Sequence, residues 1–516
     1  ATLDLVKGEW RKYSNQLLTP GDYTPADQSA TSFNVSAVNI EENGKRTPVP
    51  YVVPPGIERE INNATTNLQK LNEQSLSMRI LNLGDGDARA IYKTTDFDFR
   101  QFKNLKMYIH AEKAKQEEEL NVGDLKVFVR LGSDFTQNFY EIEIPVAFTQ
   151  WGTSSQQPEL IWPAINEMII DLEKLVAVKE RRNQLIRSGN NNINYSSYYT
   201  ENDANYKYIV VGSPSISNVN TIMIGVRNPK KQNLSDMDDM LPKSAEIWIN
   251  ELRLTDFNDK TGWAATARVR ANLADLGDVA VSGTHSTAGF GSVEKKINET
   301  QKEDITSYDI ATNLELGKFF PEKIGLKIPM HYDYSKSISN PEYNPLDPDV
   351  KLENDLASYK TEAERDSIKQ LVQDYTTRKN INFMNVRKER TGNSTKNRVY
   401  DVENFDVSYS YSEIFRRNID IEYDIKKVYR GGLGYNYSKS PKPVKPFERI
   451  GFISKYKAFT LIKDFNFFYE PKLMSFRTEM TREYNENKLR NKSAGLIILE
   501  PTFFKKFDWN RIYGFK

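Results

Sequence analysis

The residues that could carry chemistry are few and lie far apart. The chain has three histidines, His110, His285 and His331, and no cysteine. No HExxH or comparable ligand spacing joins the histidines, so we expect no metal site on them. The sequence also shows no G-x-S-x-G nucleophile motif and no phosphate-binding P-loop. It therefore predicts no catalytic site, no metal site and no cofactor, and the chain is not expected to be an enzyme.

Two further groups of side chains suggest a ligand. Asp85 and Asp87 in LGDGDAR have oxygen atoms that could chelate Ca²⁺, but an Asp-Gly turn is the preferred interpretation. Trp151, Trp162 and Trp248 suggest a sugar-binding surface. Trp248 lies in the expected strand AEIWINEL, where a core position is the preferred interpretation.

Step-two alternation dominates residues 404–440, NFDVSYSYSEIFRRNIDIEYDIKKVYRGGLGYNYSKS. Successive side chains of a strand point to opposite faces, so each run predicts a strand with one apolar and one polar face. Both a soluble β-sandwich and a membrane barrel give this pattern. Residues 426–430 fit either a turn or the middle of one long strand.

Similar alternation follows residue 261, in WAATARVRAN and in IGLKIPMHYDY. We expect one set of side chains to face lipid: Leu326, Ile328, Phe405, Val407, Tyr409, Ile419, Ile421 and Tyr423. The set expected to face a water-filled lumen comprises Arg268, Arg270, Lys327, Asp333, Asp420, Glu422 and Asp424. On the residues alone, ordinary solvent exposure on a one-sided sheet explains the second set equally well.

Changes in composition and residue pattern along the chain predict three regions. Residues 1–75 are rich in proline and are expected to form an irregular linker or strap. Residues 76–260 contain short strands and turn signals, which predict a jelly-roll-like β-sandwich with one helix at about 171–187. Residues 261–516 are expected to form barrel strands, with a long loop insertion at about 335–403 that holds a charged helical stretch at 352–379. A hairpin is expected at 464–481 and a last full strand at 496–499.

Composition narrows the function classes. The net charge is +1 at pH 7, which provides no basic excess for nucleic acid. No window of about 18 apolar residues is present, which excludes a transmembrane helix but not a barrel. The start lacks a signal peptide and the end reads as a turn entering another strand, so we expect an internal part of a longer polypeptide.

Several long stretches carry a family resemblance: VNIEENGKRTPVPYVVPPGIERE, IYKTTDFDFRQFKNLKMYIHAE, WINELRLTDFNDKTGWAATARVRANLADLG, GKFFPEKIGLKIPMHYDYSKS, NFDVSYSYSEIFRRNIDIEYD and EPTFFKKFDWNRIYGFK. With these the chain resembles the SprA/Sov family, the outer-membrane translocons of the Bacteroidetes type IX secretion system. The resemblance implies an outer-membrane location and a very large single-chain barrel that passes folded cargo, with a role in gliding motility in some relatives.

The same resemblance implies a set of partners. They are the remaining segments of the barrel, a PorV-like barrel protein at the lateral gate, a periplasmic plug protein, secreted cargo with a C-terminal signal domain, and outer-membrane lipid; nucleic acid is not among them. The expected fold is all-β with a minor helix, combining part of a very large antiparallel transmembrane barrel with an inserted jelly roll. The alternative is a soluble cell-surface carbohydrate-binding β-sandwich protein; a TonB-dependent transporter would need a TonB box and a plug domain, and the sequence shows neither.

Overall fold

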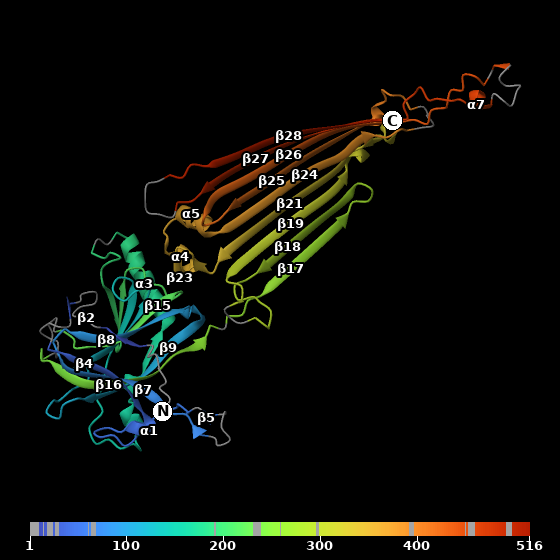
Figure 1. Ribbon diagram of the computed structural model, residues 1–516. Coiled ribbons are helices and arrows are strands. Elements are labelled where there is room, and N and C mark those ends of the chain that lie inside the picture. The colour runs from blue at the N-terminus through green and yellow to red at the C-terminus, as the bar shows by residue number, and fades with distance from the viewer. Residues whose placement is uncertain are drawn as a thin grey trace. The chain divides into compact units, whose positions relative to one another are not determined.

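The computed structural model describes residues 10–13, 15–17, 24–25, 30–59, 61–62, 69–189, 192–230, 239–258, 260–295, 299–391, 397–448, 450–451, 460–491 and 498–516. The chain divides into two compact units (Figure 1). The first, here called the jelly-roll unit, comprises Ala1–Lys260 and Leu346–Ser358. The second, the sheet unit, comprises Thr261–Pro345 and Tyr359–Lys516. Among the described helices, none is both long and apolar enough to cross a membrane.

The jelly-roll unit contains two antiparallel sheets. One has the order β1-β8-β15-β10-β11-β14-β13 and the other β12-β9-β16-β7-β4. The first sheet is built from Arg11–Lys12 (β1), Ala88–Phe97 (β8), Val219–Arg227 (β15), Lys126–Gly132 (β10), Phe139–Pro145 (β11), Tyr206–Val211 (β14) and Tyr199–Asp203 (β13). The second is built from Met168–Asp171 (β12), Phe102–Lys113 (β9), Lys243–Phe257 (β16), Gln74–Leu83 (β7) and Ser32–Asn39 (β4). The orders β8-β15-β10-β11 and β7-β16-β9-β12 are those of a jelly roll.

The core of this unit lies between the two sheets. Alternate residues of the strands, among them Ile80, Ile109 and Val129, are fully or almost fully buried there. Helix α3 (Leu172–Arg187) adds Leu175 and Val178 to the same core. The helix begins where the Asp171 carboxylate accepts hydrogen bonds from two backbone N–H groups of the first turn, which compensates donors that lack an intrahelical partner.

The prediction of an irregular segment over residues 1–75 is wrong for its described middle part. Strand β4 pairs with β7 along its whole length, and the short helix α1 (Ile40–Asn43) follows it. Val49, Tyr51 and Val52 are buried against Trp162 and Trp248. Proline removes backbone donors but does not prevent neighbouring apolar side chains from packing, so proline density alone misidentified this segment as a strap.

Residues 346–358 pack within the jelly-roll unit although they lie between strands of the sheet unit in sequence. They form β23 (Asp347–Lys351) and α4 (Leu352–Ser358). The fully buried Asp349 carboxylate accepts hydrogen bonds from the Tyr140 hydroxyl at 2.7 Å and the Ile216 N–H at 2.7 Å. The Lys179 ammonium lies 2.5 Å from Asp347 and 3.3 Å from Asp349. This buried ionic cluster anchors the segment.

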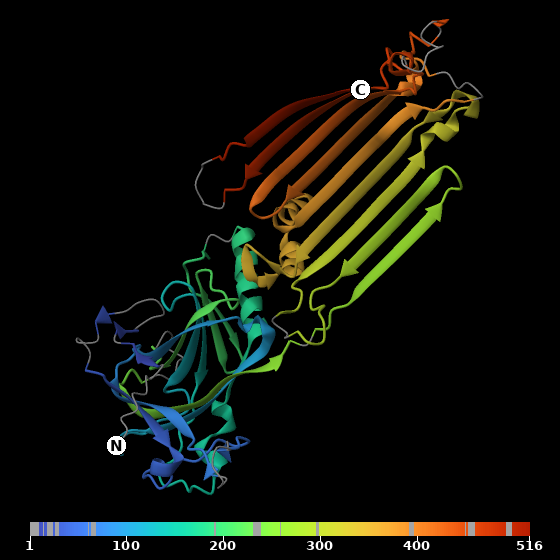
Figure 2. The ribbon, with the colours of Figure 1, turned by 45° about the vertical axis from the view of Figure 1, so that its right-hand side comes forward.

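The sheet unit is a ten-stranded antiparallel sheet in which nine strands follow one another in chain order, while β20 pairs with β24 at one side (Figures 1 and 2). Its strands are Ala264–Asn272 (β17), Gly277–Ser286 (β18), Glu303–Glu315 (β19), Leu326–Lys327 (β20), Pro329–Pro341 (β21), Asp374–Lys388 (β24), Phe405–Arg417 (β25), Ile421–Ser438 (β26), Leu473–Leu489 (β27) and Thr502–Phe515 (β28). Helices α5 (Glu362–Val372) and α7 (Thr460–Lys463) lie in its connections. Other short elements among the described residues include β2 (Asn15–Gln16), β3 (Thr24–Pro25), β5 (Ile61–Asn62), β6 (Gln69–Lys70), α2 (Pro158–Ile161) and β22 (Tyr343–Asn344).

Several expectations for this unit need correction. The segment 335–403 is not one loop insertion, because β21 extends to Pro341 and β24 occupies Asp374–Lys388. The charged stretch 352–379 therefore ends as a strand after α4 and α5. Strand β24 was missed because lysine, arginine and asparagine interrupt its apolar positions, whereas backbone pairing to both neighbouring strands stabilises it.

The structure also tests three predictions for the C-terminal part of the chain. Residues 426–430 lie in the middle of the 18-residue strand β26, so the turn alternative is wrong. The hairpin expected at 464–481 is also wrong, because β27 begins at Leu473 and pairs with β26 and β28. Of the strand expected at 496–499, residues 496 and 497 lie outside the described residues, and Ile498 and Leu499 are not in a strand.

Replacing Asp349 with alanine should destabilise the jelly-roll unit by about 3 kcal/mol, because the buried Tyr140 hydroxyl loses its acceptor and the Lys179 ammonium loses one of its two carboxylates. The free energy of unfolding from a guanidinium titration of tryptophan fluorescence measures the loss. The control is Lys351→Ala, a substitution in the same segment 346–358 that removes an ion pair to the exposed Glu173 of α3. It should change the free energy of unfolding by no more than about 0.5 kcal/mol. Equal losses for the two variants would contradict the anchoring role.

Candidate functional site

Cross-strand register gives the ten-stranded sheet two chemically different faces. Residues directly opposite one another in an antiparallel ladder place their side chains on the same face. Phe405 lies opposite Tyr435, Tyr435 opposite Phe476, and Phe476 opposite Tyr513, so one aromatic row crosses four strands. The ring centroids of Phe405 and Tyr435 are 5.0 Å apart. Apart from register shifts in β24 and at the start of β26, alternate residues of each strand therefore stay on one side of the sheet.

One side, here called the apolar face, carries aliphatic and aromatic side chains on almost every strand. Its members include Val269, Val281, Ile310, Met330, Ile381, Phe383, Phe405, Val407, Tyr409, Leu433, Phe476, Met480 and Trp509. Many of them are uncovered: Val407 is 48% exposed, Tyr409 45% and Phe507 61%. Soluble monomers rarely leave an apolar surface of this extent open to water, so this face is suited to a nonpolar environment or partner.

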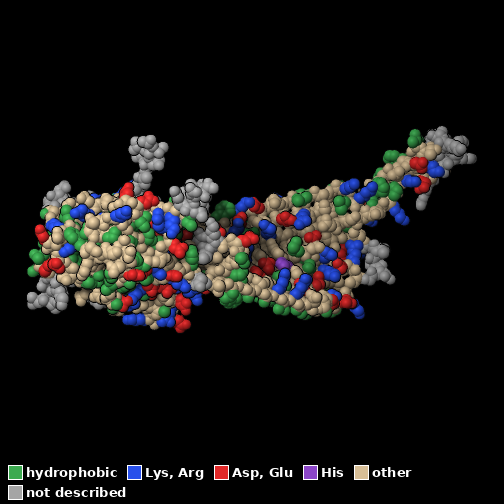
Figure 3. Space-filling model, turned by 90° about the horizontal axis from the view of Figure 1, so that it is seen from below, with side chains coloured by type: hydrophobic (Ala, Val, Ile, Leu, Met, Phe, Trp, Pro, Cys, Tyr) green, Lys and Arg blue, Asp and Glu red, His purple; other side chains and the backbone are tan. Residues whose placement is uncertain are grey.

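The opposite side, here called the polar face, carries hydroxyl, amide and charged side chains. Its members include Arg268, Arg270, Asp309, Asp333, Ser335, Asn380, Asp406, Ser408, Asp424, Arg430, Glu479 and Asp508. Asp333 accepts hydrogen bonds from the Asn380 amide at 2.6 Å and contacts the His331 ring at 3.0 Å. Figure 3 shows charged side chains of both signs in a hollow of the sheet unit. Mixed charge of this kind holds water without favouring one sign of solute.

The structure separates most of the two sets that the sequence predicted. Arg268, Arg270, Lys327, Asp333 and Asp424 lie on the polar face, and Leu326, Phe405, Val407, Tyr409 and Tyr423 lie on the apolar face. The other members lie at or beyond strand ends. Ile328 lies between β20 and β21, and Ile421 and Glu422 lie at a register shift at the start of β26. The final pair, Ile419 and Asp420, lies outside the strands. The last two are corrections, because residues 418–420 form the bend between β25 and β26.

Sequence reasoning missed the part of the apolar face that β27 and β28 contribute. Strand β28 places Phe503, Phe507, Trp509, Tyr513 and Phe515 on this face by the same alternation. The pattern is visible in TFFKKFDWNRIYGF, but Lys505 and Arg511 on the same face and Ile512 on the other obscure it. Counting aromatic residues at every second position of this segment would have identified the strand.

The tryptophans of the jelly-roll unit do not form a sugar-binding surface. Trp248 is fully buried and Trp162 is 3% exposed. The Trp162 indole N–H donates to the Val52 carbonyl, and Trp151 is half-buried and donates to the Lys113 carbonyl. The preference for a core position of Trp248 is thus confirmed, and the carbohydrate-binding alternative loses the residues that suggested it.

Neither the histidines nor the two aspartates form a metal site in the described part of the chain, which holds no suitable group of three or more His, Cys, Asp or Glu residues. Asp87 is buried and pairs with Arg89 at 2.6 Å, while its N–H closes the turn to the Gly84 carbonyl. The turn interpretation of LGDGDAR is confirmed. Burial raises the pKa of Asp87 above its ordinary range, against the opposing effect of Arg89.

His110 is a core residue. Its ring lies 4.0 Å from Trp248 in a stacked arrangement, and its Nδ1 is 2.7 Å from the Ile161 carbonyl oxygen, which identifies Nδ1 as the protonated nitrogen. Burial lowers the pKa of His110 to about 3. Nearby, burial raises the pKa of Glu112 to about 7 although the Arg46 guanidinium lies 2.7 Å away. These shifts reflect removal from water rather than poised acid–base chemistry.

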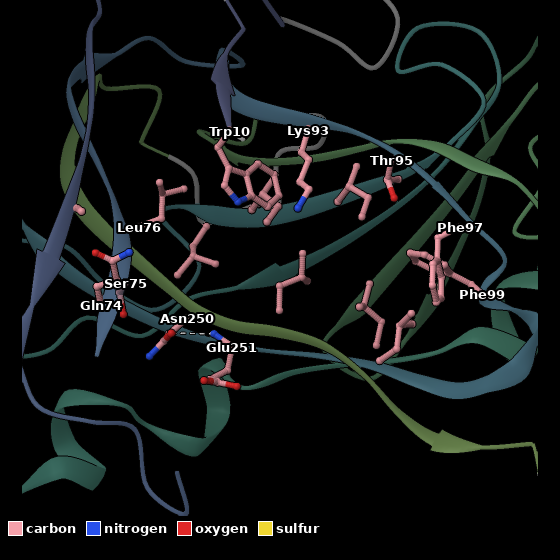
Figure 4. Close-up of a pocket in the computed structure, with 17 residues that line it drawn as sticks. Trp10, Gln74, Ser75, Leu76, Lys93, Thr95, Phe97, Phe99, Asn250 and Glu251 are labelled. Atoms are coloured by element: carbon pink, nitrogen blue, oxygen red, sulfur yellow. Dashed lines mark hydrogen bonds between the residues drawn. The ribbon is translucent and has the colours of Figure 1, made fainter. Parts of the chain in front are cut away.

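The jelly roll also contains a cavity of about 510 Å³ between its sheets (Figure 4). Aliphatic side chains such as Leu76, Ile224 and Ile249 line most of it, and Lys93 and Asn250 add polar groups. The Asn250 side-chain oxygen accepts a hydrogen bond from the Glu251 N–H, so it is engaged with the chain itself. The lining offers no nucleophile paired with a base. The sheet with its two unlike faces remains the strongest functional surface.

Comparison with known protein families identifies a match. Residues 1–356 match the family model SprA_N, described as a motility related/secretion protein. The matched region covers the described jelly-roll strands and continues through β21 into α4. No curated protein matches the chain.

Acidification should destabilise the jelly-roll unit through His110. The unfolded chain protonates this residue near pH 6.5, whereas the folded chain keeps it neutral down to about pH 3, so stability is lost as the pH falls through this window. At pH 4.5 the loss is about 3 kcal/mol relative to pH 7.5. The raised pKa of Glu112 acts in the opposite direction between pH 4.5 and 7 and is common to both proteins compared.

The check is the difference in unfolding free energy between pH 7.5 and 4.5 for the parent chain and for His110→Phe. The phenylalanine variant keeps the aromatic stack and loses the hydrogen bond to Ile161 at both pH values, so the change in its unfolding free energy from pH 7.5 to 4.5 should be more favourable than that of the parent chain by about 3 kcal/mol. The same pH dependence in both proteins would contradict the assignment.

Proposed function

Because the chain belongs to the SprA_N family of motility related/secretion proteins, we propose that its ten-stranded sheet is part of the wall of a protein-conducting channel in the bacterial outer membrane. The proposal rests on one observation: a single continuous sheet with an exposed apolar face on one side and a polar face on the other. The apolar face then contacts lipid and the polar face lines an aqueous passage.

The length of the strands supports this proposal. Strands β25, β26, β27 and β28 have 13, 18, 17 and 14 residues, and about 9–11 residues of tilted strand span a membrane. On β25 the apolar positions run from Phe405 to Tyr411, which is about 20 Å of strand. This height approaches the apolar band of outer-membrane barrels, about 25 Å.

The borders of this apolar band support it further. The row of Phe405, Tyr435, Phe476 and Tyr513 lies near one end of the band, and Tyr437, Met474 and Phe515 form a last row beyond it. On the other side Tyr411 lies opposite Tyr429, with ring centroids 5.0 Å apart. Aromatic rings that combine an apolar body with a polar edge favour the boundary between hydrocarbon and water, and barrels carry such rows at both interfaces.

The polar face suits a passage for folded cargo. Arg268, Arg270, Lys327, Asp333 and Asp424 carry both signs of charge, so the surface does not select strongly for one sign. A conduit for many proteins needs such a surface. The other partners follow from the family resemblance: further segments of the barrel, a PorV-like protein at a lateral gate, a periplasmic plug and cargo with a C-terminal signal domain.

A charge placed on each face tests the proposal. Val407→Arg puts a guanidinium in the middle of the apolar band and should cost about 2–4 kcal/mol of insertion free energy, which lowers the yield of folded protein in the outer-membrane fraction severalfold or more. Ser408→Arg puts the same group on the polar face of the same strand and should leave the yield almost unchanged. Equal yields for the two variants, or a parent chain that stays monomeric in water without detergent, would contradict the proposal.

A further inference from the structure

Beyond the Tyr411–Tyr429 pair, basic side chains appear among the apolar ones on the apolar face of β21 to β28, whereas on β17 to β19 the row of Lys379 continues with Val269, Val281 and Ile310. One row across the sheet contains Lys379, Glu413, Lys427, Tyr484 and Lys505, each directly opposite the next. The complete set of basic residues from the row of Tyr429 to the row of Arg417, here called the basic belt, is Lys336, Lys379, Arg417, Lys427, Arg482, Lys488 and Lys505. The same rows hold two acidic residues, Glu413 and Glu486. Glu422, beside these rows, pairs with Lys488 at 3.0 Å, so seven basic residues stand against three acidic ones and the belt keeps an excess of positive charge.

The centre of the belt is hollowed. A depression of about 400 Å³ on this face is lined by Tyr375, Lys379, Glu413, Arg417 and Lys427, together with Thr377, Phe415 and Ile425. The Glu413 carboxylate is shared: the Tyr411 hydroxyl donates to it at 2.5 Å, and Lys379 and Lys427 lie 3.5 Å and 3.7 Å away. One carboxylate between two ammonium groups leaves a net positive site.

Two neighbouring side chains hold the Arg417 guanidinium in place. Its guanidinium lies over the Tyr375 ring at 4.7 Å, and one Nη donates to the Gln373 side chain at 3.3 Å. Its Nε has no hydrogen-bond partner among the described residues. The Nε is itself buried, so a phosphate oxygen would meet this planar group at its Nη edge.

Position decides which anion fits. The belt adjoins the apolar band on the same face of the same strands, and apolar residues such as Phe415 and Ile425 lie within it. Tyrosines accompany it: the ring centroids of Tyr308 and Tyr375 lie 5.7 Å and 5.2 Å from the Lys336 ammonium. A lipid molecule combines an apolar acyl chain with a charged headgroup, and these two parts match the apolar band and the adjoining basic belt. Long basic side chains reach from hydrocarbon to headgroups, and anionic lipid attracts basic clusters at this level.

We propose that the basic belt binds the anionic phosphorylated headgroups of membrane lipids, with the hollow around Arg417 as the main phosphate site. The inference rests on the proposed membrane-facing role of the apolar face. It adds a lipid class and named headgroup contacts to that role.

Native mass spectrometry of the full chain in a neutral detergent tests the belt. The probes are phosphatidylglycerol and phosphatidylcholine, which share acyl chains and differ in net charge. The parent chain should retain phosphatidylglycerol at least tenfold more tightly. The triple variant K379Q/R417Q/K427Q should lose this preference. The matched control R378Q/R416Q/K426Q removes three charges from the same strands on the polar face and should keep it.

Three outcomes overturn the inference: no headgroup preference in the parent chain, an unchanged preference in the belt variant, or equal loss in both triple variants. Displacement of the lipid by inorganic phosphate at the same concentration would also overturn it, because the hollow would then be a site for a free anion. The Val407→Arg and Ser408→Arg pair separates this failure from that of the channel proposal. If that pair behaves as expected while the belt shows no preference, only the headgroup inference is wrong.

Discussion

The constraint on which the sheet unit depends is continuous cross-strand register. Backbone hydrogen bonds fix each strand against two neighbours, and a slip of one residue would move a whole set of side chains to the other face. The two register shifts in β24 and β26, between Phe383 and Val386 and between Ile421 and Tyr423, leave the apolar band on one side. Strand pairing also satisfies the backbone polar groups that hydrocarbon cannot solvate. The same ladder thus provides both the fold and the separation of the two environments.

The jelly-roll unit follows a different packing logic, because its two sheets bury their inner faces against each other. Its apolar residues are covered, as the fully buried Ile80 and Val129 show, whereas those of the sheet unit are exposed. The segment 346–358 belongs to this covered core through Asp349 although the chain on either side of it belongs to the sheet unit. Three chain crossings therefore connect the two units. A buried ionic anchor specifies where this segment docks more than it adds to stability.

The sequence sufficed where local alternation was clean. Phe405, Val407 and Tyr409 against Asp406 and Ser408 predicted two faces that the register then showed. It failed where long-range pairing decides. The buried Tyr51 lies among prolines, and β24 is rich in charged and amide side chains. The basic belt exists only because residues from β21 to β28 meet in register. No local sequence pattern predicts the basic belt, because its residues are distant from one another in the sequence.

The central claim is that one face of the sheet meets lipid and the other meets water. A nitroxide scan along β25, one label at a time from residue 405 to residue 412 in lipid nanodiscs, tests it most directly. The account predicts that accessibility to oxygen peaks at the odd positions and accessibility to a water-soluble nickel chelate peaks at the even positions, with a period of two residues. High accessibility to the nickel chelate at both odd and even positions would contradict it.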